Sequence, residues 1–165
     1  MNSKQSSKEL SNGLERAEEW SEVTRGERYI VRVSSEQTNG AYSMLEIVAD
    51  PRNGVPMHIH DNEEEHFIMV EGKALIANGD SRAETSTGSS VTIARGVPHA
   101  WCNLSEDAPL RMLVLFSPGG LEALFRENAT LEPTDKVALA NKFGTRITGP
   151  ALLFDDLYTI LSPRP

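Results

Sequence analysis

The pattern of hydrophobic and polar residues changes twice along the chain. Up to about residue 25 the chain is polar with few apolar anchors, which predicts a disordered tail followed by a short helix or an edge segment. Beyond it, short runs rich in Val, Ile, Leu and Tyr alternate with turn clusters such as Asn39-Gly40. Many short strands at this spacing, without helices between them, predict an antiparallel barrel or sandwich. The predicted strands are RYIVRV, AYSMLEIVA, HFIMV, KALIAN, SVTIA, HAWCNL and LRMLVLF.

The second change follows these strands, where the apolar residues take on helical spacing. Leu121, Leu124 and Phe125 form one apolar stripe of a predicted helix. A second helix is expected to start at a Thr134 cap and to end at Gly144, which suits a left-handed C-terminal cap. The barrel is therefore expected to carry short C-terminal helices.

These changes divide the chain into three parts. We expect a polar N-terminal segment at residues 1–26, a β-barrel at residues 27–117, and a helical segment with a tail at residues 118–165. From Ile147 onward the tail is apolar but irregular. It is expected to pack on the barrel or to exchange with a second subunit.

Composition narrows the function classes. A chain of 165 residues with 39% hydrophobic residues fits one domain with its own core. The net charge of −8 makes nucleic acid and membrane surfaces poor partners. No apolar run is long enough for a membrane span, the N-terminus lacks the apolar centre of a signal peptide, and the single cysteine, Cys102, excludes an internal disulfide. The expected location is the cytoplasm.

The strongest chemical signal is a set of three histidines and a glutamate. His58 and His60 are two apart, so on a strand both imidazoles point to one face. Glu65 follows a polar turn and can return to the same point, and His99 follows a Gly-x-Pro turn that aims the next strand there. Such a nitrogen and oxygen set suits Fe, Mn, Co, Ni, Cu or Zn rather than Ca or Mg. The alternative is that each histidine is an ordinary surface or packed residue.

Strand alternation separates the neighbours of these candidates. If a strand begins at Glu65, then Phe67 and Met69 share its face, whereas His66 points away and is a bystander. The three adjacent glutamates, residues 63–65, are otherwise read as a solvated turn.

The same alternation places Trp101 and Asn103 on the face of His99, with Cys102 on the opposite face. Trp101 then either lines a cavity beside the metal or serves as a core aromatic. Cys102 is interpreted as a buried small hydrophobe rather than a nucleophile. Glu46 is a candidate base behind the ligands if its strand face points inward, and a solvated residue if it does not.

These residues form a pattern that resembles the first motif of the cupin superfamily. That motif is Gly, five residues, His-x-His, three or four residues, Glu, six residues, Gly. Here it is matched by Gly54, His58, His60, Glu65 and Gly72, with Gly54 four rather than six residues before His58.

The second cupin motif is Gly, five residues, Pro-x-Gly, two residues, His, three residues, Asn. Here it is matched by Gly88, Ala94-Arg95-Gly96, His99 and Asn103, with Ala94 in place of the proline. The stretches at residues 112–127 and 142–150 resemble the tail of single-domain, quercetinase-like cupins. The two departures from the motifs, the spacing of Gly54 and the replacement of a proline by Ala94, concern turns and leave every ligand position intact.

The resemblance implies a mainly β fold, the cupin jelly-roll antiparallel β-barrel, that binds one divalent transition metal and frequently forms a homodimer. It does not fix a reaction, since cupins include oxygenases, isomerases, decarboxylases and binding proteins.

Three functions remain open on the sequence alone. The first is a dioxygenase-type oxidoreductase for an enolic or aromatic small molecule chelated at the metal, with Glu65 doubling as a proton acceptor and Phe67, Met69 and Trp101 lining the substrate site. The second is a non-oxidative isomerase or hydrolase that uses the metal as a Lewis acid. The third is a small-ligand-binding barrel without catalysis; the absence of a DNA-binding segment in the sequence counts against a transcriptional sensor.

Overall fold

The computed structural model describes residues 19–128 and 133–153, which form a mainly antiparallel β structure. All seven predicted strands are present. The strands are β1 (Ser21–Thr24), β2 (Glu27–Val33), β3 (Ser43–Ala49), β4 (Pro56–His60), β5 (Glu64–Glu71), β6 (Lys73–Asn78), β7 (Ser81–Ser86), β8 (Ser90–Ile93), β9 (His99–Asn103), β10 (Leu110–Ser117) and β11 (Thr145–Ala151).

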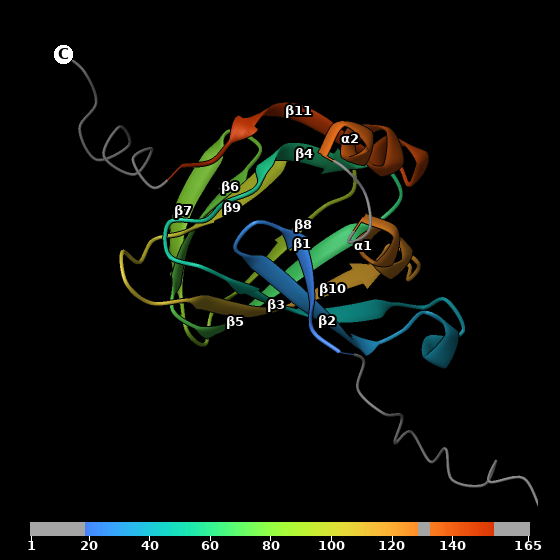
Figure 1. Ribbon diagram of the computed structural model, residues 1–165, viewed down its shortest axis with the longest axis horizontal. Coiled ribbons are helices and arrows are strands. Elements are labelled where there is room, and N and C mark those ends of the chain that lie inside the picture. Colours follow the sequence, from blue (N-terminus) through green and yellow to red (C-terminus); the bar gives the residue numbers. More distant parts are fainter. Residues whose placement is uncertain (1–18, 129–132, 154–165) are drawn as a thin grey trace, which may run out of the picture.

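The strands form two sheets that face each other, as expected for a jelly roll. One sheet has six strands in the order β1-β2-β3-β10-β5-β8, and the other has five in the order β11-β4-β9-β6-β7. Figure 1 shows the two sheets enclosing the interior, with both α-helices at one end of the barrel. The predicted jelly-roll fold is therefore confirmed.

The helices follow the last strand of the larger sheet, as the apolar stripe predicts. They are α1 (Glu122–Asn128) and α2 (Pro133–Lys142), and a short 3-10 turn, η1 (Glu36–Thr38), lies between β2 and β3. The second helix thus begins one residue before the predicted cap, and Gly144 has the left-handed φ of 76° expected of a C-terminal cap. Within the described residues, no helix is long and apolar enough to cross a membrane.

The two ends of the described chain both add strands to the barrel. Residues 21–24 form edge strand β1, which pairs with β2. Of the two alternatives predicted for this segment, the edge segment is therefore confirmed, and the short helix is wrong for these residues. Residues 145–151 form β11 and pair with β4, although the chain from Ile147 onward was expected to be irregular. The predicted tail at residues 1–18 and the chain end at 154–165 lie outside the described residues.

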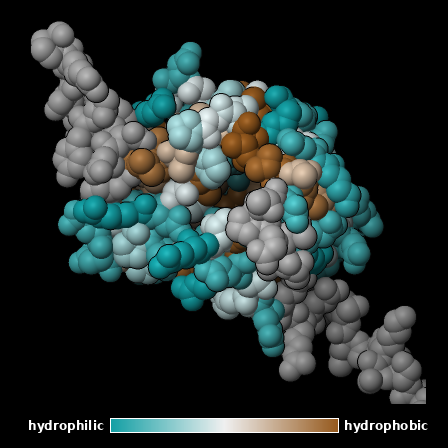
Figure 2. Space-filling model, turned by 45° about the horizontal axis from the view of Figure 1, so that its top comes forward, coloured by the Kyte–Doolittle hydropathy of each residue, from teal (hydrophilic) through white to brown (hydrophobic). Residues whose placement is uncertain are grey.

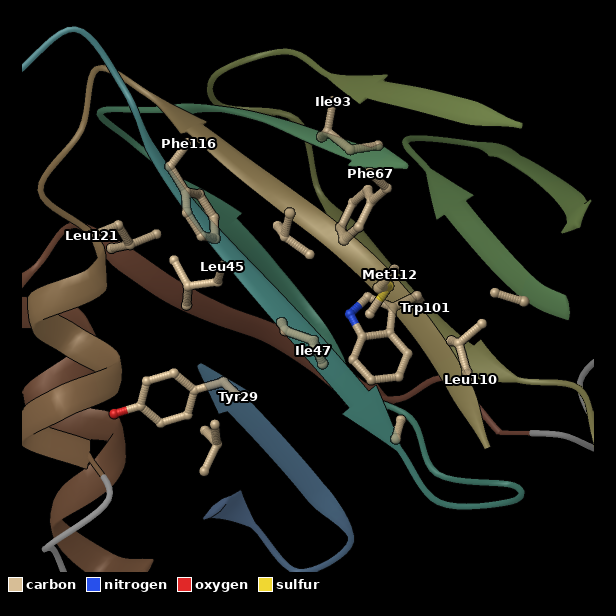
Figure 3. Close-up of a cluster of buried hydrophobic side chains, with 14 of the residues drawn as sticks. Tyr29, Leu45, Ile47, Phe67, Ile93, Trp101, Leu110, Met112, Phe116 and Leu121 are labelled. Atoms are coloured by element: carbon tan, nitrogen blue, oxygen red, sulfur yellow. The ribbon is translucent and has the colours of Figure 1, made fainter. Parts of the chain in front are cut away.

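The core lies between the sheets and follows strand alternation. On β10 the inward residues Leu110, Met112, Val114 and Phe116 are at most 1% exposed, while the residues between them are half-exposed. Figure 3 shows Phe116 and Trp101 within this cluster and Tyr29 beside the helices. The hydrophobic effect thus fixes which face of each strand points inward and, with it, which polar side chains are carried into the interior.

Candidate metal centre

The structure brings His58, His60, Glu65 and His99 together. One potential ligand atom from each lies within 4.8 Å of all the others. His58 and His99 are directly paired across β4 and β9 in the five-stranded sheet, whereas Glu65 comes from β5 in the six-stranded sheet. The cluster therefore joins the two sheets from inside the barrel.

Local sequence explains this convergence. His58 and His60 alternate with Ile59, so both imidazoles leave the same face of β4. The turn before β9 uses Gly96 at a φ of 77°, a conformation that favours glycine. The Gly96 amide donates to the His60 carbonyl at 2.9 Å, which ties that turn to the end of β4 and directs His99 toward the cluster.

Each imidazole is oriented through its Nδ1 atom. The Nδ1 atom lies 2.7 Å from the Pro56 carbonyl in His58 and 2.9 Å from the Val97 carbonyl in His99. In His60 it lies 2.9 Å from Oγ1 of Thr145. A carbonyl only accepts, so Nδ1 of His58 and His99 is the donor, and Nε2 is the atom that each of these rings presents to the cluster.

The electrostatics keep the glutamate ionised and one histidine neutral. Burial, reinforced by the neighbouring imidazoles, lowers the pKa of His58 to about 3. Burial opposes the charge on Glu65, but hydrogen bonds and attraction to His60 and His99 outweigh it and hold its pKa well below the usual range. Burial also opposes the charge on His99, yet its contact with Glu65 raises its pKa.

This donor set fits a transition metal. Three imidazoles and one carboxylate match the ligands of Fe, Mn, Co, Ni, Cu and Zn sites and leave positions for exogenous ligands on a metal that takes five or six. His60, Glu65 and His99 are each at most 5% exposed. A carboxylate buried against imidazoles is costly without a compensating charge, which a divalent cation provides.

A cavity of about 390 Å³ opens onto the cluster. His58, His60 and Glu65 of the cluster line it, and its apolar wall includes Val23, Val55, Trp101, Phe116, Leu124 and Phe125. A second, largely apolar hollow of about 260 Å³ shares part of this wall and is bounded by Val137, Ala140 and Ile147. Figure 2 shows a hollow in the surface with hydrophobic residues gathered around it. The lining of the cavity thus combines the ligand cluster with a largely apolar wall.

The predicted substrate-lining residues have different positions. Trp101 lines the cavity. Phe67 and Met69 share the inward face of β5 with Glu65, as alternation predicts, but they lie in the core at 1% and 2% exposure and not along the cavity. Phe116 and Phe125 provide aromatic wall instead, and Phe116 packs edge-on against His60 at a ring separation of 5.6 Å.

The residues interpreted as bystanders lie away from the cluster. Nδ1 of His66 lies 2.9 Å from Oγ1 of Thr92, on the outer side of β5. Cys102 is buried among small apolar residues on the far side of β9. Glu46 is buried but makes ion pairs with Arg32 and Arg111, so it belongs to a structural cluster and does not line the cavity.

Sequence reasoning also missed two buried polar residues of the cavity, Glu27 and Thr145. Both are 5% exposed, and they come from β2 and β11 at opposite ends of the described chain. Glu27 shares strand parity with the apolar Tyr29 and Val31, and this was the available signal, because a charged residue on an apolar face is unusual.

Comparison with known proteins identifies relatives of this arrangement. Residues 45–116 match the profile of the Cupin domain family, a range that contains the whole cluster. An uncharacterized protein of Streptomyces coelicolor is 41% identical over 56 residues, which are 34% of this chain and 51% of that protein. The chain therefore spans about half the length of the curated relative that it matches.

Solved structures share the fold at low sequence identity. KdgF from Halomonas sp. is 16% identical with a TM-score of 0.57, covering 64% of this chain and 91% of that one. An RmlC-like cupin from Shewanella frigidimarina is 16% identical with a TM-score of 0.55, covering 64% and 87%. The polyketide cyclase RemF from Streptomyces resistomycificus is 19% identical with a TM-score of 0.51, covering 67% and 78%. At these identities the likeness shows the fold alone.

Proposed function

The chain carries a cupin domain at residues 45–116, and from this premise we propose that it is a metal-dependent oxygenase of small enolic or aromatic molecules. Its cofactor is one divalent transition metal held by His58, His60, Glu65 and His99. Its substrate binds with two adjacent oxygens toward the cluster and its ring in the apolar part of the cavity. A homodimer is the proposed assembly.

One observation carries this proposal: the four potential ligand atoms lie within 4.8 Å of one another, and His58, His60 and Glu65 also line a cavity whose wall is largely apolar. A structural metal site is closed by its protein ligands, whereas a catalytic one faces a space that admits substrate. Here His58, His60 and Glu65 line such a space. Its volume, about 390 Å³, lies in the range of small-molecule sites.

The chain's own residues prepare the site in three ways. The Nδ1 contacts with Pro56, Thr145 and Val97 fix the imidazole orientations. Aromatic rings on the wall contact a flat substrate, and the apolar lining keeps bulk water from it. Glu65 contributes the anionic member of the ligand set, since the neighbouring imidazoles hold its pKa well below the usual range. When bound, the metal supplies Lewis acidity toward chelating oxygens and, if redox-active, electron exchange with dioxygen.

A second candidate function uses the same site without oxygen. The donor set accommodates zinc as well as iron. With zinc, polarisation of a substrate carbonyl supports isomerisation or hydrolysis. A barrel that binds a small ligand without turnover is the third alternative.

The test begins with metal analysis by plasma mass spectrometry of protein purified without added metal or chelator. Wild type is compared with a His58→Ala/His60→Ala variant and with His66→Ala, a matched control on the outer side of β5. Near-stoichiometric Fe, Mn, Ni, Co or Cu is expected in wild type and His66→Ala and is expected to be lost from the double variant. An oxygen electrode then measures O₂ uptake with flavonols, catechols and enolised diketones.

Oxygen uptake that follows metal content across the three proteins supports the oxygenase. Turnover that persists under argon with zinc-loaded protein would replace it with the non-oxidative function. Equal metal content in wild type and the double variant would overturn the ligand assignment itself.

A further inference from the structure

Glu27 is a buried carboxyl outside the candidate ligand set that lines the same cavity. It begins β2, pairs with Thr24 on β1 and Ala49 on β3, and is 5% exposed. It lines the same cavity as His60 and Glu65. The fold therefore places a second carboxyl in the space where a substrate binds.

The groups around Glu27 do not neutralise it. Oγ1 of Thr24 donates to Oε2 of Glu27 at 3.3 Å, a long hydrogen bond. Lys136 of α2 attracts Glu27, but its Nζ atom donates to the Val23 carbonyl at 2.5 Å. Glu65 of β5 repels it. The remaining titratable groups of the cavity lining are His58 and His60. Burial is the largest effect and, opposed by Thr24, raises the pKa of Glu27 to about 7.

Two other buried glutamates, Glu46 and Glu122, show how a structural role satisfies such a carboxylate. Glu46 lies between Arg32 and Arg111, and Glu122 accepts from the backbone amides of Ser35 and Gly120 at 2.7 and 2.9 Å. Within the described residues, none of the ion pairs involves Glu27. Its burial costs stability without such compensation, and groups of that kind concentrate at functional sites.

We propose that Glu27 is the catalytic residue that exchanges a proton with the substrate in this cavity. The carboxylate removes the proton of a substrate hydroxyl: the substrate O–H bond breaks, its electron pair stays on the substrate oxygen, and an O–H bond forms on Glu27. The same proton then passes to product or solvent, which restores the carboxylate. This inference deepens the proposed function and rests on it.

Glu65 is less suited to this task than Glu27. Its Oε2 atom lies 2.6 Å from Nε2 of His99 and 3.3 Å from Nε2 of His60, so it is engaged within the cluster. A metal bound there would draw further on the same oxygens. Glu27 is not one of the proposed metal ligands. Its pKa of about 7 lies near neutral pH, where a general base is most effective.

The first experiment follows the Glu27 carboxyl directly by carbon-13 NMR of metal-free protein labelled at the glutamate carboxyls. Glu27→Gln identifies its resonance, and Glu84→Gln, an exposed residue on β7, is the control for an equal change of charge. A resonance that titrates near neutral pH, is absent from Glu27→Gln and is retained in Glu84→Gln is expected. Titration in the range of ordinary glutamates would overturn the inference.

The second experiment counts protons when zinc-loaded protein binds nitrocatechol at pH 8 in weak buffer. If Glu27 takes up the hydroxyl proton, wild type and Glu84→Gln release about one proton fewer per bound nitrocatechol than Glu27→Gln does. Equal proton release with intact binding would overturn the role of Glu27 alone. Failure of zinc-loaded wild type to bind nitrocatechol would overturn the proposed function and this inference with it.

Discussion

The Nε2 atom of His99 lies 2.6 Å from Oε2 of Glu65, across the interior of the barrel. His99 belongs to the five-stranded sheet and Glu65 to the six-stranded sheet. Because Nδ1 of His99 donates to the Val97 carbonyl, a hydrogen bond at Nε2 requires a second proton on the ring. This proton joins the two sheets at the position of the proposed metal.

Metal binding is therefore expected to stabilise the whole fold. At a free zinc concentration about 100 times Kd, the stabilisation is about 2.7 kcal/mol, which corresponds to a Tm increase of about 5–10 °C for a chain of this size. Thermal unfolding of wild type with zinc and with chelator measures it. Glu65→Gln should lose the increase, and His66→Ala should keep it. An equal increase in Glu65→Gln would contradict ligation by this residue.

A second prediction concerns the pH dependence of stability in the metal-free protein. The pKa of Glu27 rises from 4.5 in the unfolded chain to about 7 in the folded one. Below pH 4.5 the residue is protonated in both states and contributes nothing. Between 4.5 and 7 the unfolded chain releases a proton that the folded one retains, so wild type loses stability, by about 3 kcal/mol at pH 8.

Glu27→Gln removes this titration. Urea unfolding should show the variant more stable than wild type by about 3 kcal/mol at pH 8, with the difference shrinking toward pH 5. Glu84→Gln, exposed on β7, should show no such trend. A difference between Glu27→Gln and wild type that stays constant over this pH range would contradict the raised pKa.

The sequence predicts the inward faces of the strands well because alternation is a local property. It places Glu65 with Phe67 on one face of β5 and Trp101 with His99 on one face of β9, and the structure agrees. Alternation does not say how deep along the barrel an inward residue lies. For that reason Phe67 was expected beside the substrate but lies in the core.

Other features have no local signal. Strand β7, Ser81–Ser86, is polar and mostly exposed, and it forms by pairing with β6 rather than by burying an apolar face. The cavity wall combines the β1–β2 hairpin with α1 and β11, which are far apart in the chain. The contact of Thr145 with His60 spans 85 positions. Only the tertiary fold brings these groups to the cluster.

A further prediction concerns the contribution of Asn103, the last residue of the second motif, to the stability of the fold. Its side-chain amide nitrogen lies 3.2 Å from the Ala49 carbonyl, 3.0 Å from that of Asp50 and 2.9 Å from that of Ala108. Asn103→Asp would place a buried carboxylate oxygen against these acceptors and is expected to lower the free energy of unfolding by about 3 kcal/mol or more. Urea unfolding at pH 7 measures this, and Asn78→Asp, which is half-buried, should cost about 1 kcal/mol or less. Equal losses would contradict this role of Asn103.

Phe125 tests whether the two hollows bind one elongated substrate. Phe125 lines both hollows, and its ring centroid lies 5.4 Å from that of Tyr29 and 5.9 Å from that of Phe116. If the cavity of about 390 Å³ (the inner hollow) and the hollow of about 260 Å³ (the outer hollow) form one site, a one-ring diol bound at the cluster is expected to occupy the inner hollow alone, and a two-ring diol to extend past Phe125.

Phe125→Ala should therefore discriminate between catechol and dihydroxynaphthalene. Removal of the apolar wall is expected to raise the Kd of dihydroxynaphthalene about tenfold and that of catechol about twofold or less, since roughly 1.4 kcal/mol of apolar contact is lost only where the second ring lies. Calorimetric titration of zinc-loaded protein measures both values. Ile68→Ala, an exposed apolar residue on β5, is the matched control and should change neither. If Phe125→Ala raises the Kd of both diols equally, the outer hollow is not part of the substrate site. An equal loss of affinity would instead indicate a change at the ligand cluster, which both diols contact.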